Sequence, residues 1–144
     1  MRCQVMDEPV EKAYAYVTRF VEEPCDLLVF SHRNRDAGVQ VPKGTVEPGE
    51  EPREAVVREI REESGLTELH RIEYLVTDTW EHPSRGRYRR HFFHVEVDHE
   101  RERWSHSVSG GGEDDGLVFE YRWQGLADVS LSRGMDEYLD QLFD

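Results

Sequence analysis

Residues 44–66, GTVEPGEEPREAVVREIREESGL, constrain the fold more than any other part of the chain. Pro52 suits the first turn of a helix, because the N–H that it lacks would have no partner there. No helix breaker follows until Gly65, which is placed as the residue after the C-terminus of the helix. We therefore predict a helix over residues 52–64. Its apolar residues form one narrow stripe that would pack on a core: Val56, Val57 and Ile60.

The other side of this predicted helix carries three carboxylates, Glu59, Glu62 and Glu63, at positions i, i+3 and i+4. Like charges at this spacing destabilise a helix by roughly 0.2–0.5 kcal/mol per pair, and the C-terminal end of the helix dipole disfavours anions. Hard divalent cations such as Mg²⁺ prefer carboxylate oxygens, so one interpretation is a metal site. The alternative, for an arbitrary Glu-rich helix, is a solvated acidic surface.

The spacing of the whole stretch resembles the Nudix box. Gly44 is followed by five residues and Glu50, and then by seven residues and the run REIREESGL, which begins at Arg58 and ends at Leu66. The resemblance implies a metal-dependent hydrolase of nucleoside diphosphates that are linked to another group. It also implies an α+β fold of the Nudix type, an α/β/α sandwich with a mixed β-sheet, in a single domain over residues 1–144.

The same resemblance implies roles for individual residues. Four of them would bind Mg²⁺ or Mn²⁺, the last through its carbonyl: Glu59, Glu62, Glu63 and Gly44. The expected catalytic residues are Glu59, Glu63, Arg58 and Glu50, with Arg58 and Glu50 paired so that Arg58 has an orienting role. Glu59 is the first choice for the general base, and the alternatives outside the box are Glu113, Asp114, Asp115 and Glu120. An ordinary helix ion pair for Arg58 and a helix-terminal carboxylate for Glu50 remain the simpler interpretations.

Two basic features outside this helix concern the substrate. Lys43 precedes Gly44, and this Pro-Lys-Gly sequence resembles the branches of the family that act on dinucleoside polyphosphates and diphosphoinositol phosphates. The run HPSRGRYRRH, residues 82–91, is the one basic cluster of the chain, and arginine suits bidentate contacts with phosphate. We expect substrate contacts from Lys43, Arg87, Arg89 and Arg90. Because strand residues alternate in direction, at most half of the arginine cluster can face one ligand; a solvated hairpin tip is the alternative.

These features favour hydrolysis of a nucleoside polyphosphate, or of a dinucleoside polyphosphate, as the function. ADP-ribose, nucleotide sugars and nucleoside triphosphates are alternative substrates, and a nucleotide-sensing domain without turnover is an alternative of another class. The intact box argues against the last. Four aromatic residues are available to stack on a nucleobase, although aromatic residues of a sheet are mostly core: Trp80, Tyr88, Trp104 and Tyr121.

The remaining pattern predicts the order of strands, helix, strands, helix. We expect strands over residues 12–20, 25–31, 39–41, 71–80, 87–98 and 117–123, and a C-terminal helix over residues 133–143. Residues 81–86 are predicted to be a hairpin turn. In the strand over residues 71–80, one face is expected to carry Ile72, Tyr74, Val76 and Trp80.

Composition excludes several classes of partner. The formal net charge is −13, from 31 acidic and 18 basic residues, so a nucleic-acid polymer is not expected to bind, whereas a small nucleotide can still bind through a metal. No apolar stretch is long enough to span a membrane, and Cys3 and Cys25 lack metal or redox spacing. We expect a cytoplasmic protein without membrane contact. Many members of the family are homodimers, so a homodimer is compatible with the resemblance.

Overall fold

The computed structural model describes residues 8–19, 26–33, 36–98, 101–110 and 115–143. Its strands are β1 (Val10–Arg19), β2 (Asp26–His32), β3 (Lys43–Thr45), β4 (Leu69–His82), β5 (Gly86–Val97), β6 (Arg103–Ser107) and β7 (Val118–Gly125). The α-helix is α1 (Pro52–Ser64), and the chain ends in three 3-10 segments, η2 (Leu126–Asp128), η3 (Ser132–Gly134) and η4 (Leu139–Phe143). Two of the residues proposed above as a general base, Glu113 and Asp114, lie outside the described residues, as do both cysteines.

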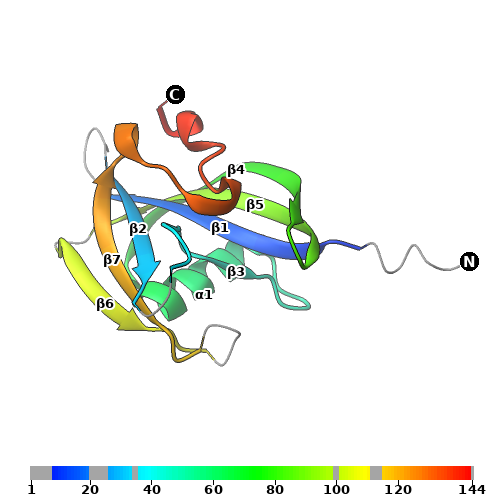
Figure 1. Cartoon of the computed structure of the whole chain (residues 1–144), viewed down its shortest axis with the longest axis horizontal. Coiled ribbons are helices and arrows are strands. Elements are labelled where there is room, and N and C mark those ends of the chain that lie inside the picture. Colours follow the sequence, from blue (N-terminus) through cyan, green and yellow to red (C-terminus); the bar gives the residue numbers. More distant parts are fainter. Residues whose placement is uncertain (1–7, 20–25, 34–35, 99–100, 111–114, 144) are drawn as a thin grey trace, which may run out of the picture.

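A single sheet organises the described residues. Its strands follow the order β4-β5-β1-β2-β7-β6, with β3 paired to β1. The β1–β5 pair is parallel and the other pairs are antiparallel, so the sheet is mixed, as predicted. The helix α1 covers one face, and the C-terminal segments cover the other (Figure 1). No helix in the described part of the chain is both long and apolar enough to cross a membrane.

Two cores result from the alternation of side chains along the strands. On β1, Ala13 and Ala15 belong to the cluster that packs on α1, whereas Tyr14 and Tyr16 belong to the cluster under the C-terminal segments. The Tyr16 hydroxyl donates to the Met135 carbonyl over 2.5 Å, which fixes the C-terminal segment to the middle of the sheet. Both layers are therefore attached to the same central strand.

The helix α1 has the predicted bounds because its end signals are local. Pro52 occupies the first turn, and the Glu54 carboxylate accepts from the Glu51 backbone N–H over 2.9 Å. At the other end, Gly65 has φ 83°, and its N–H donates to the Arg61 carbonyl. This left-handed conformation suits glycine and ends the helix.

The strand β4 differs from the prediction in the direction of its side chains. Tyr74 pairs with Phe93, but Val76 pairs with Phe92, and the register shift between them marks a β-bulge. The extra residue reverses the alternation, so Ile72 packs on the α1 side and Val76 packs on the C-terminal side. The prediction of a single face from Ile72 to Trp80 is wrong for this reason.

The C-terminal helix predicted over residues 133–143 is also wrong. Arg133 has φ 54° and Gly134 has φ 69°, both in the left-handed region, so an α-helix cannot pass through them. The segment instead forms short 3-10 turns. Met135 and Leu139 are buried all the same, against the sheet face opposite α1.

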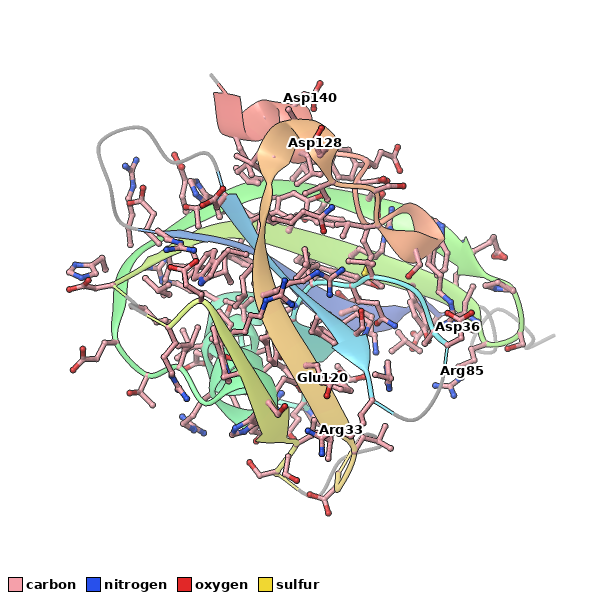
Figure 2. All side chains as sticks on the ribbon, turned by 60° about the vertical axis from the view of Figure 1, so that its left-hand side comes forward. Arg33, Asp36, Arg85, Glu120, Asp128 and Asp140 are labelled. Carbon is pink, nitrogen blue, oxygen red and sulfur yellow. The ribbon has the colours of Figure 1, made fainter. Side chains whose placement is uncertain are left out.

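The β2–β7 pair carries an exposed ion pair. Arg33 directly follows β2, and its guanidinium donates to the Glu120 carboxylate of β7 over 3.0 Å (Figure 2). Both side chains are about half exposed, at 48% and 50%. Glu120, one of the residues proposed above as a general base, is therefore engaged on the surface of the β2–β7 pair.

Candidate active site

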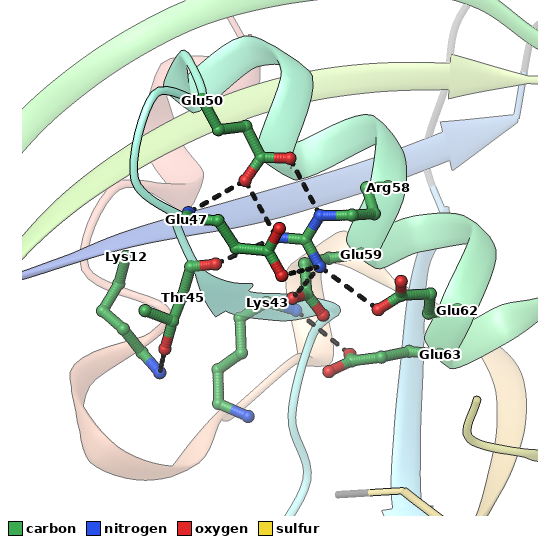
Figure 3. Close-up of polar contacts among 9 residues, drawn as sticks. All are labelled: Lys12, Lys43, Thr45, Glu47, Glu50, Arg58, Glu59, Glu62 and Glu63. Carbon is green, nitrogen blue, oxygen red and sulfur yellow. Dashed lines mark hydrogen bonds and ion pairs between the residues drawn. The ribbon is translucent and has the colours of Figure 1, made fainter. Parts of the chain in front are cut away.

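Arg58 is the centre of the polar side of α1. Its Nε and Nη2 donate to the two oxygens of Glu50 over 2.8 and 3.0 Å, and Nη2 also donates to the Thr45 carbonyl over 3.0 Å. The remaining nitrogen, Nη1, lies 2.9 Å from Glu59 Oε2 and 3.2 Å from Glu62 Oε1 (Figure 3). Arg58 thus joins the loop before the helix to two of the helix carboxylates, and its partner is the one expected from the sequence.

Burial and this shared cation set the acidity of the carboxylates. The side chains of Arg58, Glu50 and Glu59 are only 17%, 15% and 13% exposed. The hydrogen bond from Arg58 lowers the pKa of Glu50. For Glu59 burial is the larger effect, and it raises the pKa although Arg58 opposes it. Two carboxylates that bond to the same guanidinium therefore have pKa values shifted in opposite directions.

Two glycines leave the space that these carboxylates fill. A Cβ added at Gly44 of β3 would overlap the Glu59 carboxylate, and one added at Gly110 would overlap the Glu62 carboxylate. Gly110 also has φ 103°, a conformation that other residues rarely adopt. The close approach of backbone to carboxylate therefore requires glycine at both positions.

The donor set of this site suits a hard divalent cation. Three carboxylates come from consecutive turns of one helix side, and Glu63 is 2% exposed, with Oε1 accepting from the Lys43 backbone N–H over 3.2 Å. Within the described residues, no three acidic, histidine or cysteine side chains are arranged so that they could hold a metal ion together. Glu59 and Glu62 instead share the Nη1 atom of Arg58. Carboxylate oxygens beside an open cavity nevertheless match the preference of Mg²⁺.

The glutamates open into a cavity of about 810 Å³. Its lining includes the predicted metal ligands and, from other parts of the fold, a second group of side chains: Lys12, Trp80, His82, Arg85, Tyr88 and Arg133. Lys12 lies between the two groups. Its Nζ donates to Thr45 Oγ1 beside the glutamates over 3.1 Å and lies 5.0 Å from the centre of the Tyr88 ring in the second group. The cavity therefore combines an acidic part with a basic and aromatic part.

The structure brings only some of the predicted substrate residues to this cavity. Lys43 lines it, and its Nζ donates to Gln40 Oε1 over 2.9 Å. Arg87 and Arg89 are exposed on β5 and are not part of the lining, and Arg89 pairs with Glu11 over 2.9 Å. The predicted phosphate track along the hairpin is therefore not formed by these arginines.

Arg90 requires a correction. Its side chain is fully buried, and it bonds to both oxygens of Asp78 over 2.9 and 2.6 Å. The guanidinium also lies 5.7 Å from the centre of the Tyr14 ring and 5.1 Å from that of Trp80. A buried arginine that is already bonded to a carboxylate cannot contact a substrate, so we withdraw Arg90 from the substrate-binding residues.

Two basic side chains of the lining, Lys12 and Arg133, have no predicted site role, because the sequence pattern places them only in a strand and a helix. His82 and Arg85, which belong to the basic run over residues 82–91, also line the cavity. Of the aromatic residues, Trp80 and Tyr88 line the cavity. In contrast, Trp104 and Tyr121 stack on each other in the core, with their rings 5.2 Å apart. Among the alternative general bases, Asp115 lines the cavity.

Comparisons with known proteins agree with this architecture. The NUDIX domain family model matches residues 11–143, whereas a search of curated proteins found no match. Similar solved structures include the E. coli dihydroneopterin triphosphate pyrophosphohydrolase, with a TM-score of 0.67 and 18% identity over 91% of this chain and 92% of that chain. A C. elegans Ap4A hydrolase has a TM-score of 0.60 and 18% identity, with 94% and 96% covered.

A third similar structure is the NUDIX domain of Shewanella oneidensis NrtR complexed with ADP ribose. Its TM-score is 0.70, with 15% identity over 98% of this chain and 90% of that chain. At these identities the structures establish a common fold, while the family match extends from β1 to the last 3-10 segment. The chain therefore belongs to the NUDIX domain family.

Proposed function

We propose that the protein hydrolyses a pyrophosphate bond in a nucleoside diphosphate-linked compound, with a nucleoside or dinucleoside polyphosphate as the preferred substrate. The observation that carries the proposal is the arrangement of Glu59, Glu62 and Glu63 along one side of a cavity that also contains Lys12 and Lys43. Carboxylates suit a divalent cation, and the ammonium groups of the two lysines suit phosphate oxygens.

The proposed metal ligands are the three helix glutamates and the Gly44 carbonyl, with Mg²⁺ or Mn²⁺ as the cation. A cation held by these residues would supply charge neutralisation for the diphosphate and a lowered pKa of a water molecule. Arg58 would hold Glu50, Glu59 and Glu62 in place through its three nitrogens. Glu59 is the preferred general base within the box, and its side chain lines the cavity beside those of Glu62 and Glu63.

The preference for a polyphosphate rests on Lys12 and Lys43 and not on the arginines of β5. Lys12 and Lys43 come from neighbouring strands, β1 and β3, and both line the cavity. Trp80 and Tyr88 form part of the same lining and offer ring faces to a nucleobase. The similar structures are consistent with such a range of ligands, since their names include a triphosphate pyrophosphohydrolase, an Ap4A hydrolase and a complex with ADP ribose.

The test is a substrate panel with Mg²⁺, resolved by product analysis. The panel contains diadenosine polyphosphates, nucleoside triphosphates, ADP-ribose and nucleotide sugars. We expect cleavage that EDTA abolishes, with the polyphosphates preferred. The variants Glu62→Gln and Glu63→Gln should each lower kcat by at least about 100-fold, because a neutral amide is a poor ligand for a hard cation.

Glu54→Gln is the matched control. This residue lies on the same helix and is exposed, and glutamine can still accept the N–H of Glu51. Its kcat should stay within about twofold of the wild type. Unchanged kcat in both Glu62→Gln and Glu63→Gln would refute the metal assignment. A preference for ADP-ribose or a nucleotide sugar would refute the polyphosphate assignment alone.

A further inference from the structure

His82, the last residue of β4, has a defined tautomer. Its Nδ1 lies 3.0 Å from the backbone N of Ser84 and 3.1 Å from that of Arg85, so it accepts two N–H groups of the hairpin turn. A ring nitrogen that accepts hydrogen bonds carries no proton. The proton of the imidazole is therefore on Nε2, and this nitrogen is a donor.

The guanidinium of Arg133 brings a second donor next to Nε2 of His82. The Nη1 atom of Arg133 lies 3.0 Å from Nε2 of His82. Since a guanidinium has only donors, the two nitrogens cannot bond to each other and instead compete for an acceptor. The contact is thus a pair of converging donors beside a cavity that both residues line.

The fold holds Arg133 in this position despite an unfavourable backbone conformation. Its φ of 54° and ψ of 36° are rare for a residue with a side chain, and such conformations are common where a side chain must point at a ligand. The carbonyls of Arg133 and Gly134 accept from Nη1 of the buried Arg90 over 3.4 and 3.3 Å. Arg90 in turn is fixed by Asp78, so Arg133 is placed by a buried ion pair.

A continuous row of contacts joins these donors to the glutamate helix. The centre of the His82 ring lies 5.2 Å from that of the Tyr88 ring, and Lys12 Nζ lies 5.0 Å from the centre of the same Tyr88 ring. Lys12 reaches Thr45, whose carbonyl accepts from Arg58. A ligand that spans the cavity can therefore meet both the glutamates and the converging donors.

We propose that His82 Nε2–H and the guanidinium of Arg133 form an anion subsite for a phosphoryl group of the substrate remote from the bond that is cleaved. A phosphoryl oxygen accepts from both donors at once and removes their competition. The inference rests on the proposed function, because it assigns the far end of a polyphosphate substrate. It would also distinguish substrates by phosphate number.

Two variants test the subsite. Arg133→Gln removes the charge, and His82→Asn removes Nε2 while an amide oxygen can still accept the turn N–H groups. Arg71→Gln is the matched control. Arg71 lies on β4, as His82 does, its side chain is 62% exposed, and it pairs with Glu73 over 3.7 Å. Circular dichroism melting curves of the variants check that each one folds.

The first measurement is calorimetric titration with inorganic tripolyphosphate in EDTA, so that it needs neither metal nor turnover. We expect Arg133→Gln and His82→Asn to weaken binding by at least about tenfold and Arg71→Gln to change it by less than twofold. Equal binding in all the proteins would overturn the subsite. This result is independent of whether the panel above detects hydrolysis, so the subsite and the proposed function can fail separately.

The second measurement separates a substrate phosphoryl group from free phosphate. KM is compared for adenosine tetraphosphate and adenosine triphosphate, which differ by one terminal phosphate. Arg133→Gln should raise KM for the longer substrate by about tenfold more than for the shorter one. Weaker tripolyphosphate binding with an equal change in both KM values would overturn the assignment to the substrate. Long-range ¹H–¹⁵N spectra that place the His82 proton on Nδ1 would overturn the donor pair itself.

Discussion

Replacing Arg90 with methionine tests whether one buried ion pair holds the C-terminal layer on the sheet. The Arg90 side chain is fully buried, Asp78 is 17% exposed, and two hydrogen bonds of 2.9 and 2.6 Å join them. The variant keeps most of the apolar volume but, among the described side chains, leaves the Asp78 carboxylate with only the hydroxyl of Tyr138, at 2.7 Å. Breaking a buried pair in this way costs about 3–5 kcal/mol, a large share of the roughly 5–15 kcal/mol that stabilises a domain.

The assay is urea unfolding followed by tryptophan fluorescence. Arg89→Met is the control, because it makes the same substitution at the preceding residue of β5, where the side chain is 47% exposed and pairs with Glu11. An exposed pair of this kind contributes about 0.2–1 kcal/mol. Adding Asp78→Asn to Arg90→Met should restore part of the lost stability, since it removes the unpaired charge.

The reasoning would be refuted if Arg90→Met destabilised the protein no more than Arg89→Met does. A double variant less stable than Arg90→Met alone would also contradict it, because the loss would then reflect packing rather than an uncompensated charge. The direction of the Asp78 pKa shift agrees with a stabilising Arg90–Asp78 pair. Burial raises it, but the hydrogen bonds from Arg90 and Tyr138 outweigh burial and the net pKa lies below 3.8.

Two further predictions concern the glutamate site and the pH dependence of stability. Gly44→Ala should displace Glu59 and weaken Mn²⁺ binding at least about tenfold by calorimetry, whereas Gly125→Ala, where a Cβ meets only an ordinary contact at 3.8 Å, should leave it unchanged. Burial lowers the pKa of His94 below 6.5, so the unfolded chain binds more protons than the folded protein just below that pH. The His94 contribution to the free energy of unfolding should therefore be complete above pH 6.5 and be lost as the pH falls toward the pKa of the folded protein. In urea unfolding at several pH values, His94→Gln should reduce the dependence of this free energy on pH below 6.5. The same dependence in the variant and the wild type would contradict the assignment.

The parts of the fold that were predictable depend on neighbours along the sequence. The ends of α1 follow from Pro52 and Gly65, which lie within or next to the helix. The bulge in β4 was not predictable in this way, because it exists only in the pairing of β4 with β5. The helical spacing of the C-terminal residues was misleading for a related reason, since the same burial is achieved by 3-10 turns once Arg133 is fixed from Arg90, 43 residues away.

The same distinction applies to the candidate site. Arg58 and Glu50 are eight residues apart, in a stretch with fixed spacing, and the sequence identified them as a pair. Arg90 looked like a phosphate ligand because a run of arginines carries no information on which of them is buried. A signal was present, however: a hairpin turn over residues 81–86 places Asp78 opposite Arg89, and the shorter turn of the structure, in which His82 pairs with Gly86, places it opposite Arg90. Charge complementarity across a predicted hairpin should therefore be considered before a ligand is assigned.

The net charge of −13 raises the question of how this chain attracts a phosphate ligand at all. The cavity has an acidic part and a basic part, and the two should bind phosphate in different ways. On α1 the glutamates repel phosphate unless a cation is present, so affinity there should depend on metal. At the other group of side chains, Lys12, His82 and Arg133 present donors without any metal. Binding of a polyphosphate should consequently show two components, one that EDTA removes together with turnover and one that persists in EDTA and is lost in Arg133→Gln.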